Sequence, residues 1–427
     1  MAQPTAKARG WGGGAGWRAA AALGALLAIA ASLAAVGIHL LGPRALEPVD
    51  LRVYLAGAAA MVHHARLYGA GFDPAQRLPF TYPPIAAALM VPLSLLGERL
   101  LSVVWDAGSL AALAWTLGRV MGRAGRRAVW AATGLALVTQ PVFDNLSLGQ
   151  VDMLLMAAAV AGCLATDRQP WPAAWVGVAA AVKVVPGLFL VYLLLARRWR
   201  PLAVAASAWA VLTGAGFLLR PQSSWRYFTH TLWQVGRPGS PTSYLNQSLW
   251  GMVDRLGLGV WHAPVLACAV AVVVVWGLRH ALALQRAGQP AAASVAVGLV
   301  GVLVSPIAWI HEAVWAVPAV ALLATGGLAG WAAASPRALW RAGALALLLA
   351  ARLPALGARL LALPLALPLA QLLEDAVGLA ALTLLTQGPW LAGPPRAPDN
   401  ASPTLPCPSR PPSADGFVPC GGILWPD

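Results

Sequence analysis

Apolar segments alternate with short polar loops through most of this chain. The apolar runs occupy residues 17–41, 100–117, 128–143, 151–165, 202–219, 263–278, 291–304, 313–331, 342–356 and 361–385. An α-helix needs about 20 mostly apolar residues to cross the hydrocarbon core of a bilayer, and these runs approach that length. The pattern therefore predicts an all-α, polytopic membrane protein.

One further apolar block, WPAAWVGVAAAVKVVPGLFLVYLLLARRWR, has Pro186 near its middle and basic residues at its far end. Proline breaks the helical hydrogen-bond ladder, and broken helices are tolerated in membranes where they line a polar cavity. We expect two half-length helices that meet at residues 183–187. Counting both gives about 12 transmembrane segments.

The arginines predict the topology, because basic residues are retained on the cytoplasmic side. Arg119, Arg123, Arg126 and Arg127 lie in one short loop, which we place in the cytoplasm. That assignment requires the preceding stretch FTYPPIAAALMVPLSLLGERL, which begins within LPFTYPP, to form a re-entrant or juxtamembrane helix that does not cross. We expect a cytoplasmic tail at 1–16, a transmembrane domain at 17–387 with an outer loop and re-entrant segment at 42–99, and a disordered, Pro-rich cytoplasmic tail at 388–427.

The composition is also typical of a membrane protein, and it changes how the net positive charge is interpreted. Hydrophobic residues make up 59% of the chain and charged residues only 10%, whereas soluble domains carry about 25% charged residues. The net charge of +14 records orientation in the membrane rather than binding of nucleic acid, which we exclude. The four cysteines show no metal-ligand spacing and imply no disulfide framework.

The outer loops hold four polar clusters, at residues 50–82, 144–150, 220–254 and 305–312. They carry carboxylates, histidines, amides and aromatic residues, whereas the inner loops carry mostly arginines. We therefore expect the functional site at the outer boundary between water and lipid. Candidate substrate contacts in or near these clusters are Arg52, Tyr54, Tyr82, Gln150, Lys183, Asn246, Gln247 and Glu312.

Asp50 is the candidate catalytic base. It follows the first apolar run closely enough to be held at the interface, where a carboxylate can accept a proton from an attacking hydroxyl group. The alternative is that Asp50 caps the helix predicted at LRVYLAGAA, since aspartate favours that position. We expect a catalytic Asp50 to face a cavity that it shares with the SPIAWIHE segment.

His311 and Glu312 lie in that segment, at the outer end of a predicted span. Ionisable groups at membrane depth favour a functional role, and interfacial snorkelling is the alternative. A neutral imidazole can hydrogen-bond a sugar or phosphate oxygen. Lys183, within the broken block, and Arg52 are candidate counter-charges for a lipid phosphate, and for Lys183 the alternative is a helix-end residue that reaches the headgroups.

Several familiar signatures are absent from the sequence. There is no Walker loop, no HExxH, no GxSxG and no metal-ligand cluster. We therefore predict no metal and no cofactor.

The ordered set VDLRVYLAGA, LPFTYPPIAAALMVPLSLLG, NLSLGQVDMLL, AAVKVVPGLFLVYLLLARRWR, NQSLWGMVDRL and SPIAWIHEAVWAVP resembles glycosyltransferase family 87 over residues 45–320. The resemblance implies a GT-C membrane fold and an inverting hexosyltransferase that acts on the outer face of the cell membrane. It further implies a polyprenyl-phosphate-mannose donor, a mannosylated glycolipid acceptor of the cell envelope, and an α-(1→2) linkage.

The resemblance also implies residue roles. Asp50 matches the acidic residue that acts as base early in the first outer loop, and His311 matches the histidine of an SPxxWxHH-like segment. This sequence departs from the family pattern at Glu312, where a second histidine is common, and at Asp152, where GQxN is common. These departures bear on the acceptor rather than on the reaction.

Other classes remain open at this stage. An arabinose-type or other polyprenyl-phosphate-sugar transferase would share the same chemistry. A lipid or sugar transporter would concentrate ionisable residues at mid-membrane and show an internal repeat, and neither is seen in the sequence. A non-catalytic scaffold subunit is a third possibility.

Overall fold

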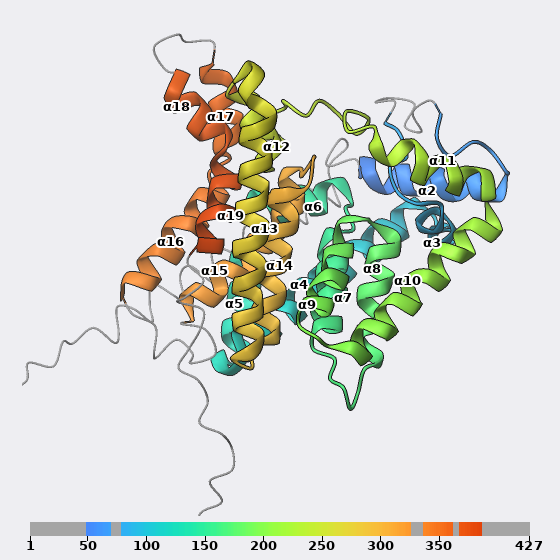
Figure 1. Ribbon diagram of the computed structural model, residues 1–427, viewed down its shortest axis with the longest axis horizontal. Coiled ribbons are helices and arrows are strands. Elements are labelled where there is room, and N and C mark those ends of the chain that lie inside the picture. The colour runs from blue at the N-terminus through green and yellow to red at the C-terminus, as the bar shows by residue number, and fades with distance from the viewer. Residues whose placement is uncertain (1–47, 70–77, 326–335, 362–366, 387–427) are drawn as a thin grey trace, which may run out of the picture. The chain divides into compact units, whose positions relative to one another are not determined.

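The computed structural model describes residues 48–69, 78–325, 336–361 and 367–386. Within these ranges the regular elements are helices, and one isolated antiparallel bridge joins Asn246 to Trp309 (Figure 1). The expected first span at 17–41 and the two expected tails, 1–16 and 388–427, lie outside the described residues. The structure thus describes an all-helical protein.

The first half of the described chain contains α2 (Val49–Val62), α3 (Pro84–Ser94), α4 (Glu98–Met121), η1 (Gly122–Ala124), α5 (Arg126–Ala136), α6 (Gln140–Leu148), α7 (Asp152–Cys163), η2 (Trp171–Ala173), α8 (Ala174–Val182), η3 (Val185–Gly187), α9 (Leu188–Leu195) and α10 (Trp199–Leu219). The second half contains α11 (Pro221–Thr229), η4 (Thr231–Trp233), α12 (Leu249–Arg255), η5 (Gly259–Trp261), α13 (His262–Arg286), α14 (Pro290–Val304), η6 (Ile310–Trp315), α15 (Ala316–Ala324), α16 (Pro336–Ala350), α17 (Leu353–Leu360), α18 (Leu367–Glu374) and α19 (Ala376–Thr386).

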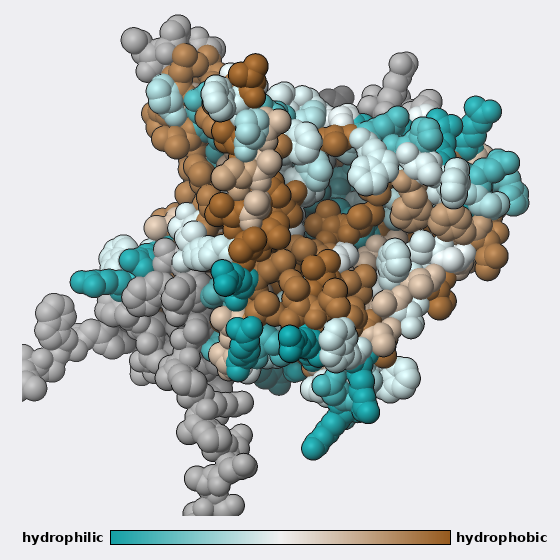
Figure 2. Space-filling model, viewed as in Figure 1, coloured by the Kyte–Doolittle hydropathy of each residue, from teal (hydrophilic) through white to brown (hydrophobic). Residues whose placement is uncertain are grey.

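Three described helices are long and apolar enough to cross a membrane: α4, α10 and the segment Gly259–Arg286. If each of three bent helix pairs is one span, the number of candidates rises to six. Figure 2 shows a hydrophobic band between two hydrophilic margins on one face of the molecule. The chain is therefore a helical membrane protein, and the expected total of about 12 segments stays a prediction.

The break predicted at residues 183–187 is present. Helix α8 ends at Val182, Lys183 adopts an extended backbone with φ −138° and ψ 135°, and a short 3₁₀ turn at Val185–Gly187 leads into α9. Pro186 cannot donate the backbone hydrogen bond that a continuous helix would need. The interruption places the Lys183 side chain at a junction between two half-length helices.

The LPFTYPP stretch leads into the short helix α3, and its expected re-entrant or juxtamembrane placement stays a prediction. The 11 residues of α3 extend over only about 16 Å at 1.5 Å per residue. That length is too short to cross a hydrocarbon core of about 30 Å. Helix α3 packs against α2, so the two short helices form one unit beside the long spans (Figure 1).

Four predicted segments differ from the structure. The expected span at 128–143 is divided between α5 and α6, and most of the expected loop DNLSLGQ is helical, as part of α6. Pro141 lies in the first turn of α6 and separates it from α5. The expected spans at 342–356 and 361–385 are likewise divided, with bends of 59° between α16 and α17 and 64° between α18 and α19.

Helix α14 lies at the centre of the largest hydrophobic cluster. Each residue from Ala291 to Leu303 is buried, and α14 packs against α7, α13, α19 and η6. A helix that is apolar on all sides is expected at the core of a large helical protein. Helix α14 leads directly into the SPIAWIHE segment, so the core fixes the position of that segment.

Candidate active site

One cavity of about 590 Å³ contains residues from all four polar clusters that the sequence places at the outer side. The polar groups that line it are Asp50, Tyr54, Thr81, Tyr82, Asp144, Gln150, Lys183, Tyr227, Ser240, Ser243, Trp309, His311 and Glu312. Asp50 and His311 thus face the same space, although they are far apart in the sequence. A concave site with convergent polar groups is where binding and catalysis are expected.

Asp50 is held at the start of α2 by a close approach of the α6–α7 turn. Gly149 ends α6 with φ +69°, and a Cβ atom added there would lie 2.7 Å from the Cβ of Leu51. Only glycine fits such a left-handed turn against a neighbouring helix without strain. The turn brings Gln150 to Asp50, and Gln150 Nε2 donates a hydrogen bond of 2.7 Å to Asp50 Oδ2.

The alternative role of Asp50 as a helix cap is not observed. Pro48 occupies the N-cap position of α2, and no side chain caps this helix end. The carboxylate instead lines the cavity and binds the amide of Gln150.

Two buried tyrosines fix the orientation of the Gln150 amide. The Tyr54 hydroxyl donates to Gln150 Oε1 at 2.7 Å, and the Tyr82 hydroxyl lies 2.9 Å from that of Tyr54 and 3.3 Å from the same Oε1. The carboxylate needs a donor and the tyrosines need an acceptor, so the NH₂ group of Gln150 must face Asp50. Tyr54 also lies four residues after Asp50 and therefore shares its helix face.

The surroundings of Asp50 suit a general base. Burial raises the pKa of Asp50 from its usual value of 3.8 to about 6, and the negative charge of Asp152 acts in the same direction. The hydrogen bond from Gln150 and the charge of Lys183 oppose this increase in the pKa. A base with a pKa close to the working pH combines correct protonation with strong driving force for proton transfer.

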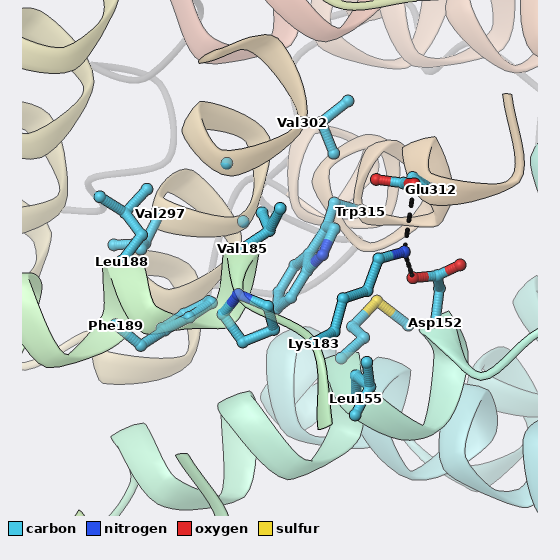
Figure 3. A pocket seen from close by; sticks show the side chains of 14 residues that line it. Asp152, Leu155, Lys183, Val185, Leu188, Phe189, Val297, Val302, Glu312 and Trp315 are labelled. Carbon is cyan, nitrogen blue, oxygen red and sulfur yellow. Dashed lines mark hydrogen bonds and ion pairs between the residues drawn. The ribbon is translucent and has the colours of Figure 1, made fainter. Parts of the chain in front are cut away.

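Lys183 forms the centre of a buried ionic cluster at the wall of the cavity. Its Nζ lies 2.7 Å from Asp152 Oδ1 and 3.1 Å from Glu312 Oε1 (Figure 3). The three side chains are mostly shielded from solvent, with exposed fractions between 9% and 16%. Buried charges persist when they are paired, and here α7, the α8–α9 break and η6 each contribute one member.

His311 is buried at the wall of the cavity, 5% exposed. Its Nε2 lies 3.7 Å from Asp152 Oδ2, beyond hydrogen-bond distance. The segment that carries His311 is anchored by residues 246–248. Asn246 Oδ1 accepts a hydrogen bond from the backbone N–H of Ala308 at 3.0 Å, and the backbone N–H of Gln247 donates to the Ala308 carbonyl at 2.7 Å.

The structure does not bring Arg52, Asn246 and Gln247 to the cavity. Arg52 lies two residues after Asp50, and residues i and i+2 point to different sides of a helix. Its Nε instead donates to Glu98 Oε1 at 2.6 Å. Asn246 and Gln247 are fully buried. Asn246 Nδ2 binds the Pro241 and Pro306 carbonyls, and Gln247 Nε2 binds those of Tyr244 and Glu374.

Asp152 belongs to the site, although the sequence marks it only as a departure from the family pattern and predicts no contact for it. The sequence places it two residues after Gln150, at the start of the apolar stretch MLLMAAAV. A buried carboxylate requires a counter-charge, and Lys183 is the only lysine beyond the N-terminal tail. The sequence therefore contained a signal for this ion pair, because one acid and one base each lie alone in an otherwise apolar segment.

Comparisons with known proteins identify the family of this chain. The model of glycosyltransferase family 87 matches residues 80–306. This range contains Tyr82, Gln150 and Lys183, and Asp50 and His311 lie outside its two ends. A crystal structure of ArnT from Cupriavidus metallidurans bound to undecaprenyl phosphate aligns with 86% of this chain and 77% of its own, at 20% identity and a TM-score of 0.37.

Curated relatives align over most of the chain. A polyprenol-phosphate-mannose-dependent alpha-(1-2)-phosphatidylinositol mannoside mannosyltransferase from Mycobacterium tuberculosis is 33% identical over 66% of this chain and 71% of its own. The protein of the same name from Mycolicibacterium smegmatis is 34% identical over 68% and 72%. A phosphatidylinositol pentamannoside mannosyltransferase from M. tuberculosis is 34% identical over 67% and 68%. This chain belongs to glycosyltransferase family 87.

Proposed function

We propose that this protein transfers mannose from a polyprenyl-phosphate-mannose donor to a hydroxyl group of a phosphatidylinositol mannoside, and that it forms an α-(1→2) linkage with inversion. The observation that carries the proposal is the carboxylate of Asp50, held by Gln150 in a cavity that also contains His311. The names of the relatives support the choice of donor, acceptor and linkage.

Asp50 acts as the general base in this scheme. One carboxylate oxygen, Oδ2, is engaged by Gln150, and no described residue hydrogen-bonds Oδ1. The acceptor hydroxyl transfers its proton to Oδ1 while its oxygen attacks the anomeric carbon of mannose. The bond between that carbon and the phosphate oxygen breaks, and the electron pair leaves with polyprenyl phosphate. A single displacement of this kind converts a β-linked donor into an α-linked product.

The leaving group requires little assistance. Phosphate stabilises the developing negative charge itself, so the site needs one base and donors that face the phosphate oxygens. His311 and Lys183 line the cavity and can supply those donors. Lys183 is already paired with Asp152 and Glu312, which makes His311 the better candidate for direct contact with the phosphate. Tyr54, Tyr82 and Gln150 orient the base, and Glu312 holds Lys183.

The reaction belongs on the extracytoplasmic side of a GT-C fold, with a catalytic domain at 17–387 and about 12 transmembrane segments. The arrangement of the arginines supports this. The start of α5 and the turn between α9 and α10 lie at the margin opposite α2 and α11 in Figure 1. These two inner positions carry Arg126, Arg127, Arg197 and Arg198, as the rule for cytoplasmic loops expects.

The proposal is tested with purified protein in lipid nanodiscs. The protein is incubated with radiolabelled polyprenyl-phosphate mannose and phosphatidylinositol mannoside, and the labelled glycolipid is digested with an α-mannosidase selective for the (1→2) linkage. We expect the glycolipid to become labelled, and we expect the α-mannosidase to release that label as mannose. If the protein transfers arabinose from polyprenyl-phosphate arabinose but no mannose from polyprenyl-phosphate mannose, the proposed donor is wrong. Transfer of the intact lipid between leaflets without a new glycosidic bond would reject the enzyme class.

A further inference from the structure

A second cavity, of about 380 Å³, lies between α11, η4 and the loop that follows them. It is lined by Gln222, Trp225, Arg226, Thr229, Gln234 and Arg237, with other residues of the same segments. Among the described residues that line it there is no carboxylate. The cavity therefore has a polar, positively charged wall.

The two arginines lack an anionic partner among the described residues. Arg226 forms no side-chain hydrogen bond or ion pair there, and Arg237 Nε is buried without a hydrogen-bond partner. Arg237 Nη2 donates only to the Phe80 carbonyl at 3.4 Å, and its guanidinium lies 5.9 Å from the centre of the Tyr68 ring. Burial and the neighbouring charge of Arg226 lower the pKa of Arg237. An unpaired donor between like charges is stabilised by a bound anion.

This cavity adjoins the candidate active site without containing its reacting groups. Tyr227 and Leu232 line the active-site cavity, whereas their neighbours Arg226 and Thr231 line the second one. Pro238, directly after Arg237, again lines the active site. The two cavities therefore lie on opposite sides of the same short segment, and Asp50 and His311 face only the active site.

That separation identifies which phosphate fits. The phosphate of the donor is bonded to the carbon that reacts, so it must lie in the cavity with Asp50. The phosphodiester of a phosphatidylinositol mannoside is separated from its reacting hydroxyl by inositol and mannose rings. Resting on the proposed function, we infer that Arg226 and Arg237 bind the phosphodiester of the lipid acceptor and thereby present its mannose to Asp50.

Trp225 adds a contact suited to the same ligand. It lines the cavity, and the residue is 67% exposed. Amphipathic aromatic rings favour the headgroup level of a bilayer, where the inositol of the acceptor also lies. Helix α11 thus offers a guanidinium for the phosphate and an indole beside it.

The inference is tested by the KM values of Arg226→Gln in nanodiscs of neutral phosphatidylcholine. We expect the KM for phosphatidylinositol mannoside to rise about tenfold, as for the loss of one hydrogen bond to a charged group. The KM for the donor and the KM for a neutral alkyl mannoside acceptor should stay unchanged. Arg237→Lys, which keeps the charge but not the two-pronged geometry, should give a smaller increase. Arg66→Gln is the matched control, because Arg66 is exposed outside both cavities.

Three outcomes would overturn the inference: an unchanged acceptor KM in Arg226→Gln, an equal rise for the neutral acceptor, or a rise for the donor. If the anion that binds Arg226 is an anionic membrane lipid rather than the acceptor, the acceptor KM of Arg226→Gln will differ from that of wild type only when phosphatidylglycerol is added to the nanodiscs. This result would also contradict the inference. Native mass spectrometry provides a readout without catalysis. Retention of phosphatidylinositol mannoside should fall in Arg226→Gln, even if wild-type protein transfers no mannose, and unchanged retention contradicts the site.

Discussion

The side-chain amide of Gln150 donates a 2.7 Å hydrogen bond to the carboxylate of Asp50 across 100 residues of sequence. The bond occupies Oδ2, and no described residue hydrogen-bonds Oδ1 of this cavity-lining carboxylate. Because Tyr54 and Tyr82 hold the other end of the amide, the carboxylate has a defined direction before any substrate arrives. Such preorganisation is what a catalytic base requires.

Replacement of Asp50 by asparagine should lower the rate of mannose transfer by about 10²–10⁴-fold, the usual contribution of a general base. The amide keeps the shape of the side chain but cannot accept the proton. Initial rates with labelled donor, at equal amounts of folded protein, measure the effect. Glu98→Gln is the matched control, since Glu98 pairs with Arg52 outside the cavity. A variant at position 50 with wild-type rates would remove Asp50 from the mechanism.

The pH profile should report the same carboxylate. Asp50 must be deprotonated to act, and its pKa is raised to about 6. We therefore expect kcat/KM to rise about tenfold per pH unit below pH 6 and to level off above it. Gln150→Leu removes a donor that lowers this pKa, so the acidic limb should move to higher pH. A profile that is flat between pH 5 and 8, or a shift to lower pH in Gln150→Leu, would contradict the assignment.

The ionic cluster predicts a stability effect. Lys183→Met leaves Asp152 and Glu312 buried without a cation, and breaking a buried pair in this way costs about 3–5 kcal/mol. We expect a clearly lower Tm in detergent. The combined change Lys183→Met, Asp152→Asn and Glu312→Gln removes the charges together and should recover most of the loss. A single variant with the wild-type Tm would mean that the carboxylates are not held by Lys183.

Close packing of α8 on α10 predicts a second stability effect. A Cβ atom at Gly177 would lie 2.2 Å from the Ala205 carbonyl oxygen and 2.7 Å from the Trp209 amide nitrogen. These are backbone atoms, so Gly177→Ala should force the helices apart and cost about 1–3 kcal/mol. Gly214→Ala, on α10 with no atom within 4 Å, is the control and should be neutral or slightly stabilising. Equal Tm values for the two variants would argue against this contact.

Local signals in the sequence were sufficient for several features of the fold. Pro186, with basic residues at the end of its block, predicted the break at Lys183, and the apolar runs predicted an all-helical protein. The arginine-rich loop predicts that LPFTYPP does not cross, and this stays a prediction. Pro141 was an equally clear signal for the separation of α5 from α6, but the run of apolar residues around it concealed the break. The helical period alone also places Arg52 away from Asp50.

Other features depend on contacts that no local pattern reveals. The bend between α18 and α19 coincides with Asp375, which pairs with Arg255 from 120 residues earlier. The amide of Gln150 was predicted to contact substrate, and its bond to Asp50 became visible only when α6 and α2 were brought together. The role of Asn246 could likewise not be read from the sequence, because its hydrogen-bond partners Pro306 and Ala308 belong to a distant segment.

The break at Lys183 has a consequence for packing around the buried charges. Because α8 ends at Val182, the Val185–Gly187 turn and the start of α9 lie beside the ionic cluster and enclose it with apolar side chains. Trp315 stacks on Phe189 there, with ring centroids 5.5 Å apart, beside the aliphatic chain of Lys183 (Figure 3). The space left there, about 30 Å³, is large enough to hold a water molecule. The same lysine thus joins two carboxylates through its ammonium group and lies against aromatic rings with its aliphatic chain, so that its replacement would disturb ionic and hydrophobic packing together.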